Sequence, residues 1–444
     1  MQRIRHGGLP TQASGHGGGS SSRSYDGMDT VGLDMVRQPQ RGHSPQQRAA
    51  TIMTWVFSGI TVLGCGLGLV GVYRRWWDVD LTAGWVLGLL AVAFVAAIAV
   101  AGFTWDRPRY RGLRRSGLLL AIQVLAMATL AAMVNVAGGF YGSMSELLGV
   151  HRGGAAVLAG GAGAGAGMSA TAVAAEPWLA DARQATGPGR GVWAPLTISG
   201  QRTGYTLPAW AYVPDAYFDT QQPTRRFPVV ILLAGYPGAV ENWERQGHMV
   251  AVLDKLMAQG TIPPMILVSV TQNPQADRDS ECVDATGGAH ADSYITEDVP
   301  EALAQHLRVQ ADRSAWSLMG YSTGGYCAVD LALRHPRQFS AAVSLDGYFE
   351  PAVDATTGDL FHNDVALRRA YTPTQTIHDH RDAPLRFDLV VGDAEPKLKQ
   401  AAKDFAAATR APDAATVVDI PGGHNWTTWT NALPAALTWL TAAR

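Results

Sequence analysis

The stretch Gly320-Tyr321-Ser322-Thr323-Gly324 lies between an apolar run at 315–319 and a helix-like stretch at 325–334. A strand, a sharp turn flanked by glycines and a helix form the context in which Gly-x-Ser-x-Gly indicates a nucleophile elbow. A side chain on either flanking glycine is expected to collide with the neighbouring strand or helix. The turn lifts the Ser322 hydroxyl clear of the sheet, at a helix N-terminus whose dipole favours developing negative charge.

A general base for Ser322 is found downstream. Where such an elbow ends a strand of an α/β sheet, the catalytic groups follow in the chain order Ser, acid, His. His424 is the last histidine and lies between a strand-like run at 415–420 and a helix-like stretch at 429–443. A loop histidine there can reach the elbow and take the Ser322 proton. The alternative is a surface histidine without a catalytic role, which the elbow disfavours.

Three carboxylates are candidates for the residue that orients the imidazole. Asp393 and Glu395 both follow a strand-like run at 387–392. We favour Glu395, because it precedes a helix-like stretch and its longer side chain can reach an imidazole. Asp393 is suited instead to a helix cap or a turn. Asp346, which ends the preceding strand-like run, is the third candidate and otherwise a turn residue.

Acyl transfer also needs an oxyanion hole, normally built from two backbone N–H groups. One donor is expected to be Thr323, directly after the nucleophile. The other is expected in the loop 234–238, which follows a strand-like run at 228–233. Tyr236 is the candidate there, because Pro237 has no N–H to donate. A plain strand-to-helix turn is the alternative reading of this loop.

These segments occur in one order along the chain. They are Leu233-Ala-Gly-Tyr-Pro-Gly238, Gly320-Tyr-Ser-Thr-Gly-Gly325, Gly392-Asp-Ala-Glu395 and Gly422-Gly-His-Asn-Trp426. The set resembles the esterase family of α/β-hydrolases, which includes S-formylglutathione hydrolases, feruloyl esterases and the mycolyltransferases of actinobacterial envelopes. The resemblance covers about residues 191–444. It implies a triad of Ser322, Glu395 and His424, oxyanion donors Tyr236 and Thr323, and no metal or organic cofactor.

The oxyanion loop departs from the mycolyltransferase pattern. Those enzymes carry an Asp before the glycine and an Arg shortly after it, both used to hold a sugar acceptor. Here Ala234 precedes Gly235, and Pro237-Gly238-Ala239 follow Tyr236. Hydrolysis, or transfer to another acceptor, therefore fits better than mycolyl transfer to a trehalose-like acceptor.

Strands alternate with helices through the last 250 residues, which predicts an α/β-hydrolase fold with a mostly parallel sheet, helices on both faces and a leading antiparallel hairpin. The insert between Gly347 and Pro384 is expected to cover the site. The predicted strands are 193–199, 205–213, 228–234, 264–270, 315–319, 341–346, 386–392 and 415–420.

The N-terminal part of the chain differs in composition from the region 191–444. Residues 1–50 are rich in Gly, Ser, Gln and Arg and are expected to be disordered. Three apolar segments at 51–73, 81–103 and 116–138 are each about as long as a membrane span, so 51–138 is predicted to be a transmembrane region. The alternative is core helices of a soluble protein. A cleaved signal peptide is a poor fit, since fifty polar residues come first.

Arginine placement predicts the orientation of these spans. The second loop is rich in arginine and is therefore expected in the cytoplasm together with the N-terminus; its arginines are Arg107, Arg109, Arg111, Arg114 and Arg115. Three spans then place the hydrolase region, 191–444, outside the cytoplasm at the plasma membrane. Residues 139–190, nearly all Gly and Ala between Gly153 and Gly167, are predicted to be a linker. A fourth span is the alternative.

The chain has three cysteines. Cys65 lies in the first apolar segment and is interpreted as a small apolar residue. A disulfide between Cys282 and Cys327 is expected outside the cytoplasm, where it would brace the nucleophile helix. Two buried free thiols are the alternative.

Charged residues exclude some partners. The net charge of −2 and the lack of a basic domain argue against nucleic acid. One loop holds several carboxylates without the spacing of a calcium loop, and we interpret it as a solvated loop. They are Asp277, Asp279, Glu281 and Asp284.

The sequence therefore predicts a membrane-anchored serine esterase that acts on a small-molecule, lipid or envelope ester. An envelope acyltransferase shares the chemistry and differs in the acceptor. A non-catalytic membrane-tethered binding module is the more distant alternative, and an intact Ser, acid and His in the right order argues against it.

Overall fold

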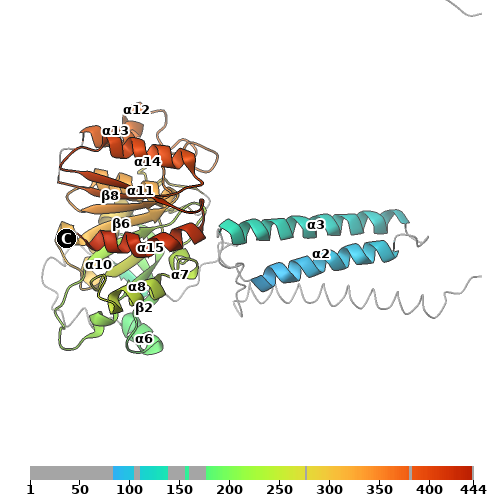
Figure 1. Ribbon diagram of the computed structural model, residues 1–444, viewed down its shortest axis with the longest axis horizontal. Coiled ribbons are helices and arrows are strands. Elements are labelled where there is room, and N and C mark those ends of the chain that lie inside the picture. Colours follow the sequence, from blue (N-terminus) through green and yellow to red (C-terminus); the bar gives the residue numbers. More distant parts are fainter. Residues whose placement is uncertain are drawn as a thin grey trace, which may run out of the picture. The chain divides into compact units, whose positions relative to one another are not determined.

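The C-terminal part of the chain forms a nine-stranded sheet in the computed structural model (Figure 1). The structure describes residues 84–104, 111–138, 156–159, 177–275, 278–379 and 383–442. The strand order is β1-β2-β3-β5-β4-β6-β7-β8-β9. Strands β2 and β3 form an antiparallel hairpin, and β4 to β9 run parallel to one another. The strands are β1 (Ala156–Ala159), β2 (Val192–Ser199), β3 (Thr206–Val213), β4 (Val229–Leu233), β5 (Ile266–Val270), β6 (Trp316–Tyr321), β7 (Ala341–Leu345), β8 (Arg386–Gly392) and β9 (Ala414–Ile420).

The predicted mostly parallel sheet with a leading hairpin is confirmed. Strands β2 to β9 begin and end within two residues of the predicted ranges. The central strands β4 to β7 are buried on both faces, and continuous apolar runs are typical of such strands. Those runs make the strands recognisable in the sequence.

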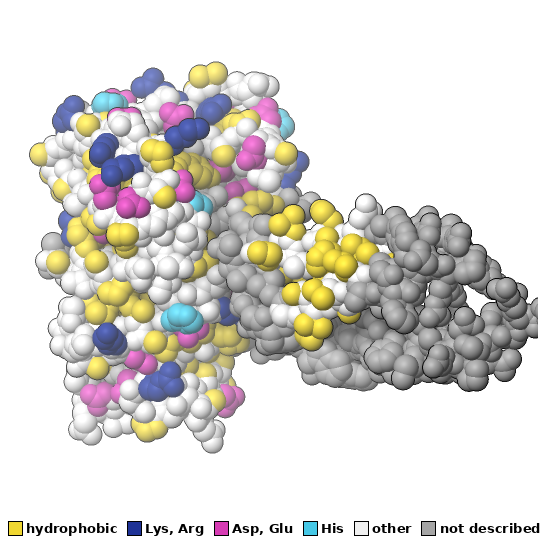
Figure 2. Space-filling model, turned by 45° about the vertical axis from the view of Figure 1, so that its right-hand side comes forward, with side chains coloured by type: hydrophobic (Ala, Val, Ile, Leu, Met, Phe, Trp, Pro, Cys, Tyr) yellow, Lys and Arg dark blue, Asp and Glu magenta, His cyan; other side chains and the backbone are white. Residues whose placement is uncertain are grey.

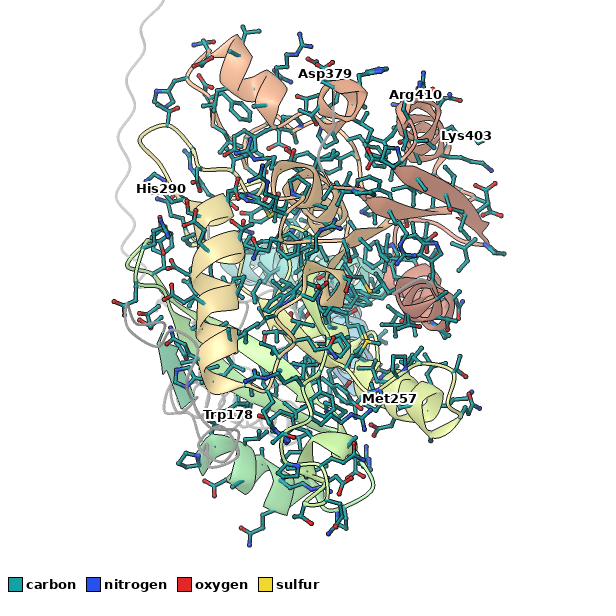
Figure 3. All side chains as sticks on the ribbon, turned by 90° about the vertical axis from the view of Figure 1, so that its left-hand side faces the viewer. Trp178, Met257, His290, Asp379, Lys403 and Arg410 are labelled. Carbon is teal, nitrogen blue, oxygen red and sulfur yellow. A yellow bond between two sulfur atoms is a disulfide. The ribbon has the colours of Figure 1, made fainter. Side chains whose placement is uncertain are left out.

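Helices cover both faces of the sheet. Neighbouring strand residues supply opposite faces: Ile231 packs with Leu303 and Phe405 in one cluster, and Leu232 packs with Leu253 and Leu437 in the other. Figure 3 shows the layers from the side, with Trp178 marking α6 and Met257 marking the end of α8. The first face carries α6 (Pro177–Thr186), α10 (Val299–His306), α11 (Thr323–Arg334) and α14 (Pro396–Ala408); the second carries α7 (Asn242–Arg245), α8 (Met249–Ala258) and α15 (Trp426–Thr441).

The linker prediction for 139–190 is wrong in two places. Strand β1 lies in its Gly/Ala-rich part and pairs in parallel with β2, and Leu158 of this strand is fully buried. Helix α6 adds the buried Leu179 to the same core. An edge strand is held by backbone hydrogen bonds, so one buried leucine among small residues is enough to dock it. Residues 139–155 and 160–176 of the predicted linker lie outside the described ranges.

Two further helices correspond to the second and third predicted membrane segments. They are α2 (Gly84–Thr104) and α3 (Arg111–Gly138), and they pack against each other. Among the described residues, no helix meets both the length and the apolar character that a membrane span requires, so the three-span prediction is not supported. The first segment, 51–73, and the N-terminal residues 1–50 lie outside the described ranges.

The insert between β7 and β8 packs against the loop that follows β5. It contains the short helices α12 (Val365–Ala370) and α13 (Pro373–Asp379). Leu360, Phe361 and Tyr371 from the insert form a small apolar cluster with Val283 and Ala285 from the loop. This contact fixes two long loops at the carboxyl end of the parallel strands, the edge where sites form in open α/β sheets.

Candidate active site

Ser322 occupies a strained turn between β6 and α11. Its φ of 56° and ψ of −125° lie outside the regions that L-residues normally adopt. The two glycines make this turn possible. A Cβ at Gly320 would lie 1.9 Å from the carbonyl oxygen of Gly324, and a Cβ at Gly324 would lie 2.2 Å from the carbonyl oxygen of Leu233. The predicted collisions with the following helix and with the neighbouring strand β4 are therefore both present.

His424 lies in the loop between β9 and α15, as the sequence predicts. Its Nε2 atom is 2.8 Å from Ser322 Oγ, a hydrogen bond between residues 102 positions apart. The ring packs edge-on against Trp429, with 5.1 Å between the ring centroids. Asn425 follows His424 and caps α15 by accepting a hydrogen bond from the Thr428 N–H, which fixes where the loop ends. The arrangement can move a proton from the serine to the imidazole.

The three candidate carboxylates all lie near this loop, in different roles. Glu395 Oε1 accepts a hydrogen bond from the backbone N–H of His424 at 3.2 Å. Asp393 accepts one from the Gly422 N–H at 2.9 Å and so supports the loop from its start. Within the described residues, the bond to Glu395 comes from the His424 backbone and not from its ring. The geometry brings Glu395 to His424 but leaves its role as the orienting acid a prediction.

Asp346 is the most buried of the three. Its two oxygens accept hydrogen bonds from the Gly392 N–H and the Trp429 indole N–H, both at 2.7 Å. Burial raises the pKa of this carboxyl, and the nearby His424 lowers it. Through Trp429, Asp346 supports the ring that packs against His424. The hydrogen bonds of Asp346 in this structure therefore reach His424 through a neighbour, Trp429.

The two segments expected to supply the oxyanion donors both lie next to the nucleophile. Thr323 is the first residue of α11, where amides have no acceptor within the helix. The loop that carries Tyr236 approaches Ser322 closely, because a Cβ at Gly235 would lie 2.9 Å from Ser322 Cβ. This contact explains the glycine before Tyr236. The role of Tyr236 and Thr323 as oxyanion donors is a proposal.

The sequence interpretation of the acidic loop after β5 is wrong for two of its members. Asp279 and Glu281 are 3% and 0% exposed, and not solvated. The next residue, Cys282, is joined by a disulfide to Cys327 of α11, which holds the loop against the nucleophile helix. The burial of Asp279 and Glu281 does not follow from the cysteine spacing alone. The expected disulfide at Cys282, directly after Glu281, is the feature of the sequence that could have indicated it. Asp277 and Cys65 lie outside the described residues.

Burial shifts the pKa of both acids upward. It raises the pKa of Asp279 to about 6 and, with the neighbouring Asp279 charge as a second cause, raises the pKa of Glu281 to about 9. Throughout the described ranges, no group of three or more His, Cys, Asp or Glu side chains is placed to hold a metal ion. The two acids instead bond to hydroxyl groups beside the elbow.

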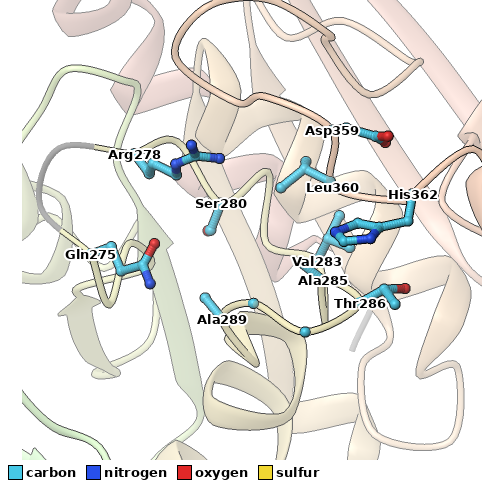
Figure 4. Close-up of a pocket in the computed structure, with 12 residues that line it drawn as sticks. Gln275, Arg278, Ser280, Val283, Ala285, Thr286, Ala289, Asp359, Leu360 and His362 are labelled. Atoms are coloured by element: carbon cyan, nitrogen blue, oxygen red, sulfur yellow. The ribbon is translucent and has the colours of Figure 1, made fainter.

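A cavity of about 330 Å³ lies between the loop after β5 and the insert (Figure 4). Arg278, Ser280 and His362 contribute polar groups to its wall, and Leu360 contributes an apolar one. Ser280 stands between Asp279 and Glu281, so the cavity and the buried acids share one segment of chain. A group bound in the cavity would contact the segment that supports the elbow.

A family model described as "Putative esterase" matches residues 200–440, more than half of the chain. A protein of Corynebacterium glutamicum described as uncharacterized is 26% identical over 242 residues, which are 52% of this chain and 56% of that protein. The chain thus spans about half the length of the curated relative it matches.

Several solved structures are also similar to part of this chain. An S-formylglutathione hydrolase from Agrobacterium tumefaciens is 19% identical, with a TM-score of 0.48, over 58% of this chain and 96% of that one. A ferulic acid esterase is 21% identical, with a TM-score of 0.46, over 57% of this chain and 98% of that one. At these values the similarities say nothing about the substrate of this chain.

Proposed function

Because this chain belongs to the putative esterase family, we propose that it is an enzyme that acts on ester bonds, a serine esterase with Ser322 as nucleophile and His424 as general base. The observation that carries the proposal is the 2.8 Å hydrogen bond between His424 Nε2 and Ser322 Oγ at a strained, glycine-flanked turn. Strain of this kind persists only where the surrounding structure holds it, and it is concentrated at functional sites.

The reaction has two halves. Ser322 Oγ attacks the ester carbonyl carbon while its proton passes to His424 Nε2, and the carbonyl oxygen becomes an oxyanion. The oxyanion collapses, the bond to the alcohol oxygen breaks, and the imidazolium returns the proton to that alcohol. Water then attacks the acyl-enzyme with His424 again as base. The acid leaves and Ser322 regains its proton.

The oxyanion is expected to accept hydrogen bonds from the backbone amides of Tyr236 and Thr323. Both belong to segments that cannot shift freely: the Gly235 loop abuts Ser322, and Thr323 begins a fully buried helix segment. Fixed donors contribute to catalysis because they need no reorganisation when the charge develops.

For the orienting acid we propose Glu395, supported by its contact with the His424 loop. Glu395→Gln is expected to lower kcat by about 10²-fold or more, since the imidazolium loses its counter-charge. Asp346→Asn is expected to lower the free energy of unfolding and to change kcat less than roughly tenfold, because it weakens the hydrogen bonds to Gly392 and Trp429. Asparagine tolerates the positive φ of 51° at that position.

Steady-state kinetics of the two variants beside Asp393→Asn would decide the acid. A large loss of kcat in Asp346→Asn with near-normal kcat in Glu395→Gln would assign the role to Asp346. A large loss only in Asp393→Asn would assign it to the runner-up.

The proposed function itself is tested with the full-length protein, p-nitrophenyl esters of short acids and a fluorophosphonate probe. Turnover and labelling in the wild type, both lost in Ser322→Ala, would support a serine esterase. Measuring the free acid and the new ester formed in the presence of an added alcohol then separates hydrolysis from acyl transfer. More new ester than free acid would favour the acyltransferase. A folded wild type with neither turnover nor labelling would overturn the proposal in favour of a binding module.

We further propose that residues 51–138 anchor the enzyme in the plasma membrane, with its N-terminus in the cytoplasm and its hydrolase region outside. Support comes from the long charge-free segments, from the arginine-rich loop between them and from the disulfide, which favours an oxidising compartment. Apolar side chains are also exposed on both described helices of this region (Figure 2). They are Leu89, Val92, Val95 and Ile98 of α2 and Leu120, Val124, Met127, Leu130 and Met133 of α3.

Washing isolated membranes with alkaline carbonate measures this anchoring. The full-length protein is expected to stay in the membrane pellet, because apolar spans resist conditions that remove peripheral proteins. A chain without residues 1–138 is expected to leave the pellet. Release of the full-length protein would contradict the anchor.

A further inference from the structure

One segment contacts the first turns of the nucleophile helix at several points. Asp279 Oδ2 accepts a hydrogen bond from Thr323 Oγ1 at 3.0 Å. Glu281 Oε1 lies 2.6 Å from the hydroxyl of Tyr348, and that hydroxyl lies 3.1 Å from Thr323 Oγ1. Cys282 is bonded to Cys327, one helical turn after Thr323. Residues 279–282 are hereafter the 279–282 clamp.

The number of hydrogens available to these hydrogen bonds indicates which group in the network is protonated. The Tyr348 and Thr323 hydroxyls have one hydrogen each. Thr323 donates its hydrogen to Asp279, so the contact between Thr323 and Tyr348 needs the Tyr348 hydrogen. The remaining contact, between Tyr348 and Glu281, then lacks a hydrogen unless Glu281 carries one. A protonated Glu281 therefore satisfies all three bonds, and an ionised Glu281 satisfies only two.

The surroundings favour a neutral Glu281. Its carboxyl is fully buried, and the ionisable groups that face it are Asp279, Asp354, Tyr326 and Tyr348, none of which is a cation. Burial and the Asp279 charge raise the pKa of Glu281 to about 9. The acid is therefore protonated at neutral pH and ionises as the pH rises through about 9.

We propose that the 279–282 clamp positions the oxyanion-hole residue Thr323, and that Glu281 does so as a neutral acid that donates its proton to Tyr348. The proposal rests on the proposed function, because it assigns a task to the Thr323 amide. With Glu281 protonated, the hydrogen bonds can run in one direction, from Glu281 to Tyr348 to Thr323 to Asp279; with Glu281 ionised, Tyr348 donates to Glu281 instead. Thr323 is thus held through its side chain, and its backbone amide is the proposed oxyanion donor.

The positioning matters because oxyanion donors act over a narrow range of distance. A small displacement of a donor lowers the rate of the chemical step, and it affects substrate binding much less, since the full charge exists only in the transition state. Asp279, Glu281 and Tyr348 are therefore positioning residues. Their loss is expected to change kcat and to leave KM nearly unchanged.

The test compares Glu281→Gln and Tyr348→Phe with the wild type in the full-length protein. A glutamine amide is neutral and can still donate to Tyr348, so Glu281→Gln is expected to keep kcat at pH 7 within about twofold. Tyr348→Phe breaks the chain of hydrogen bonds and is expected to lower kcat about tenfold, with KM changed less than about twofold. Tyr294→Phe, which removes a buried hydroxyl bonded to Ile198 elsewhere in the fold, is the matched control and should retain kcat.

The pH dependence gives an independent readout. In the wild type, ionised Glu281 takes the Tyr348 hydrogen as the pH rises through about 9, and the bond to Thr323 is lost. The kcat is therefore expected to fall across that range. Glu281→Gln cannot ionise and should lack this fall, while its kcat near pH 7 stays normal.

Two results would overturn the inference in an active wild type. The first is a kcat of Glu281→Gln as low as that of Tyr348→Phe, because the site would then need a carboxylate. The second is a Tyr348→Phe variant with normal kcat, or with an effect on KM alone. A wild type that neither turns over ester nor labels at Ser322 is a different failure: it removes the proposed function, and the inference falls with it.

Discussion

Replacing Ser322 with alanine is expected to lower kcat/KM for a carboxylic ester by about 10⁴-fold or more. Among the described residues, Ser322 carries the hydroxyl to which the His424 imidazole bonds directly, so the variant loses the proposed nucleophile. Alanine also removes the hydroxyl without adding volume to the tight turn beside Gly235. The fold should therefore persist, and the loss should appear in kcat.

Replacing His424 with alanine is expected to have an effect of the same order, and the double variant should be little worse than either single one. Residues that act as one unit are strongly non-additive, since the first loss already disables the nucleophile. Rates of p-nitrophenyl ester hydrolysis measure all three variants. Ser340→Ala is the control, because this hydroxyl contacts only backbone carbonyl groups. Substantial turnover in Ser322→Ala would contradict the assignment of the nucleophile.

Removing the disulfide with Cys282→Ala and Cys327→Ala together is expected to lower the free energy of unfolding by about 4 kcal/mol. The estimate follows from the 45 residues that the bond encloses, because cross-linking them restricts the unfolded chain. For a domain of this size the loss corresponds to a fall in Tm of roughly 10 °C. Urea unfolding followed by tryptophan fluorescence measures the difference.

The third cysteine provides the control for this comparison. Cys65→Ala should leave the urea midpoint unchanged, because the cross-link is intact. Adding a reductant should lower the wild-type midpoint toward that of the double variant and leave the double variant unaffected. Equal midpoints for the wild type and the double variant would contradict a stabilising bond between Cys282 and Cys327.

Much of the catalytic geometry is readable from local sequence because its causes are local. The elbow depends on two glycines within two residues of Ser322, and a backbone oxygen lies close to each missing Cβ. The parallel strands depend on short runs that are buried on both faces, which leaves an uninterrupted apolar stretch. His424 follows from chain order once the elbow is known.

The errors arise where burial depends on partners far away in the chain. Asp279 and Glu281 resemble a solvated loop in sequence, yet both are buried because Cys282 is bonded to a helix 45 residues later. Strand β1 resembles a linker, yet Leu158 is buried because β2 offers a sheet edge. A hydropathy average over a short stretch of sequence contains no information about either contact.

The α/β fold and the loop positions of Ser322 and His424 can be predicted from local sequence, because steric exclusion at glycines and apolar periodicity act between near neighbours. The distance between those two side chains, the burial of Glu281 and the place of Asp346 beside Trp429 cannot. Each of these depends on how distant segments pack, and on the desolvation that the packing imposes on a carboxyl group. The protonation of the clamp is therefore a property of the fold.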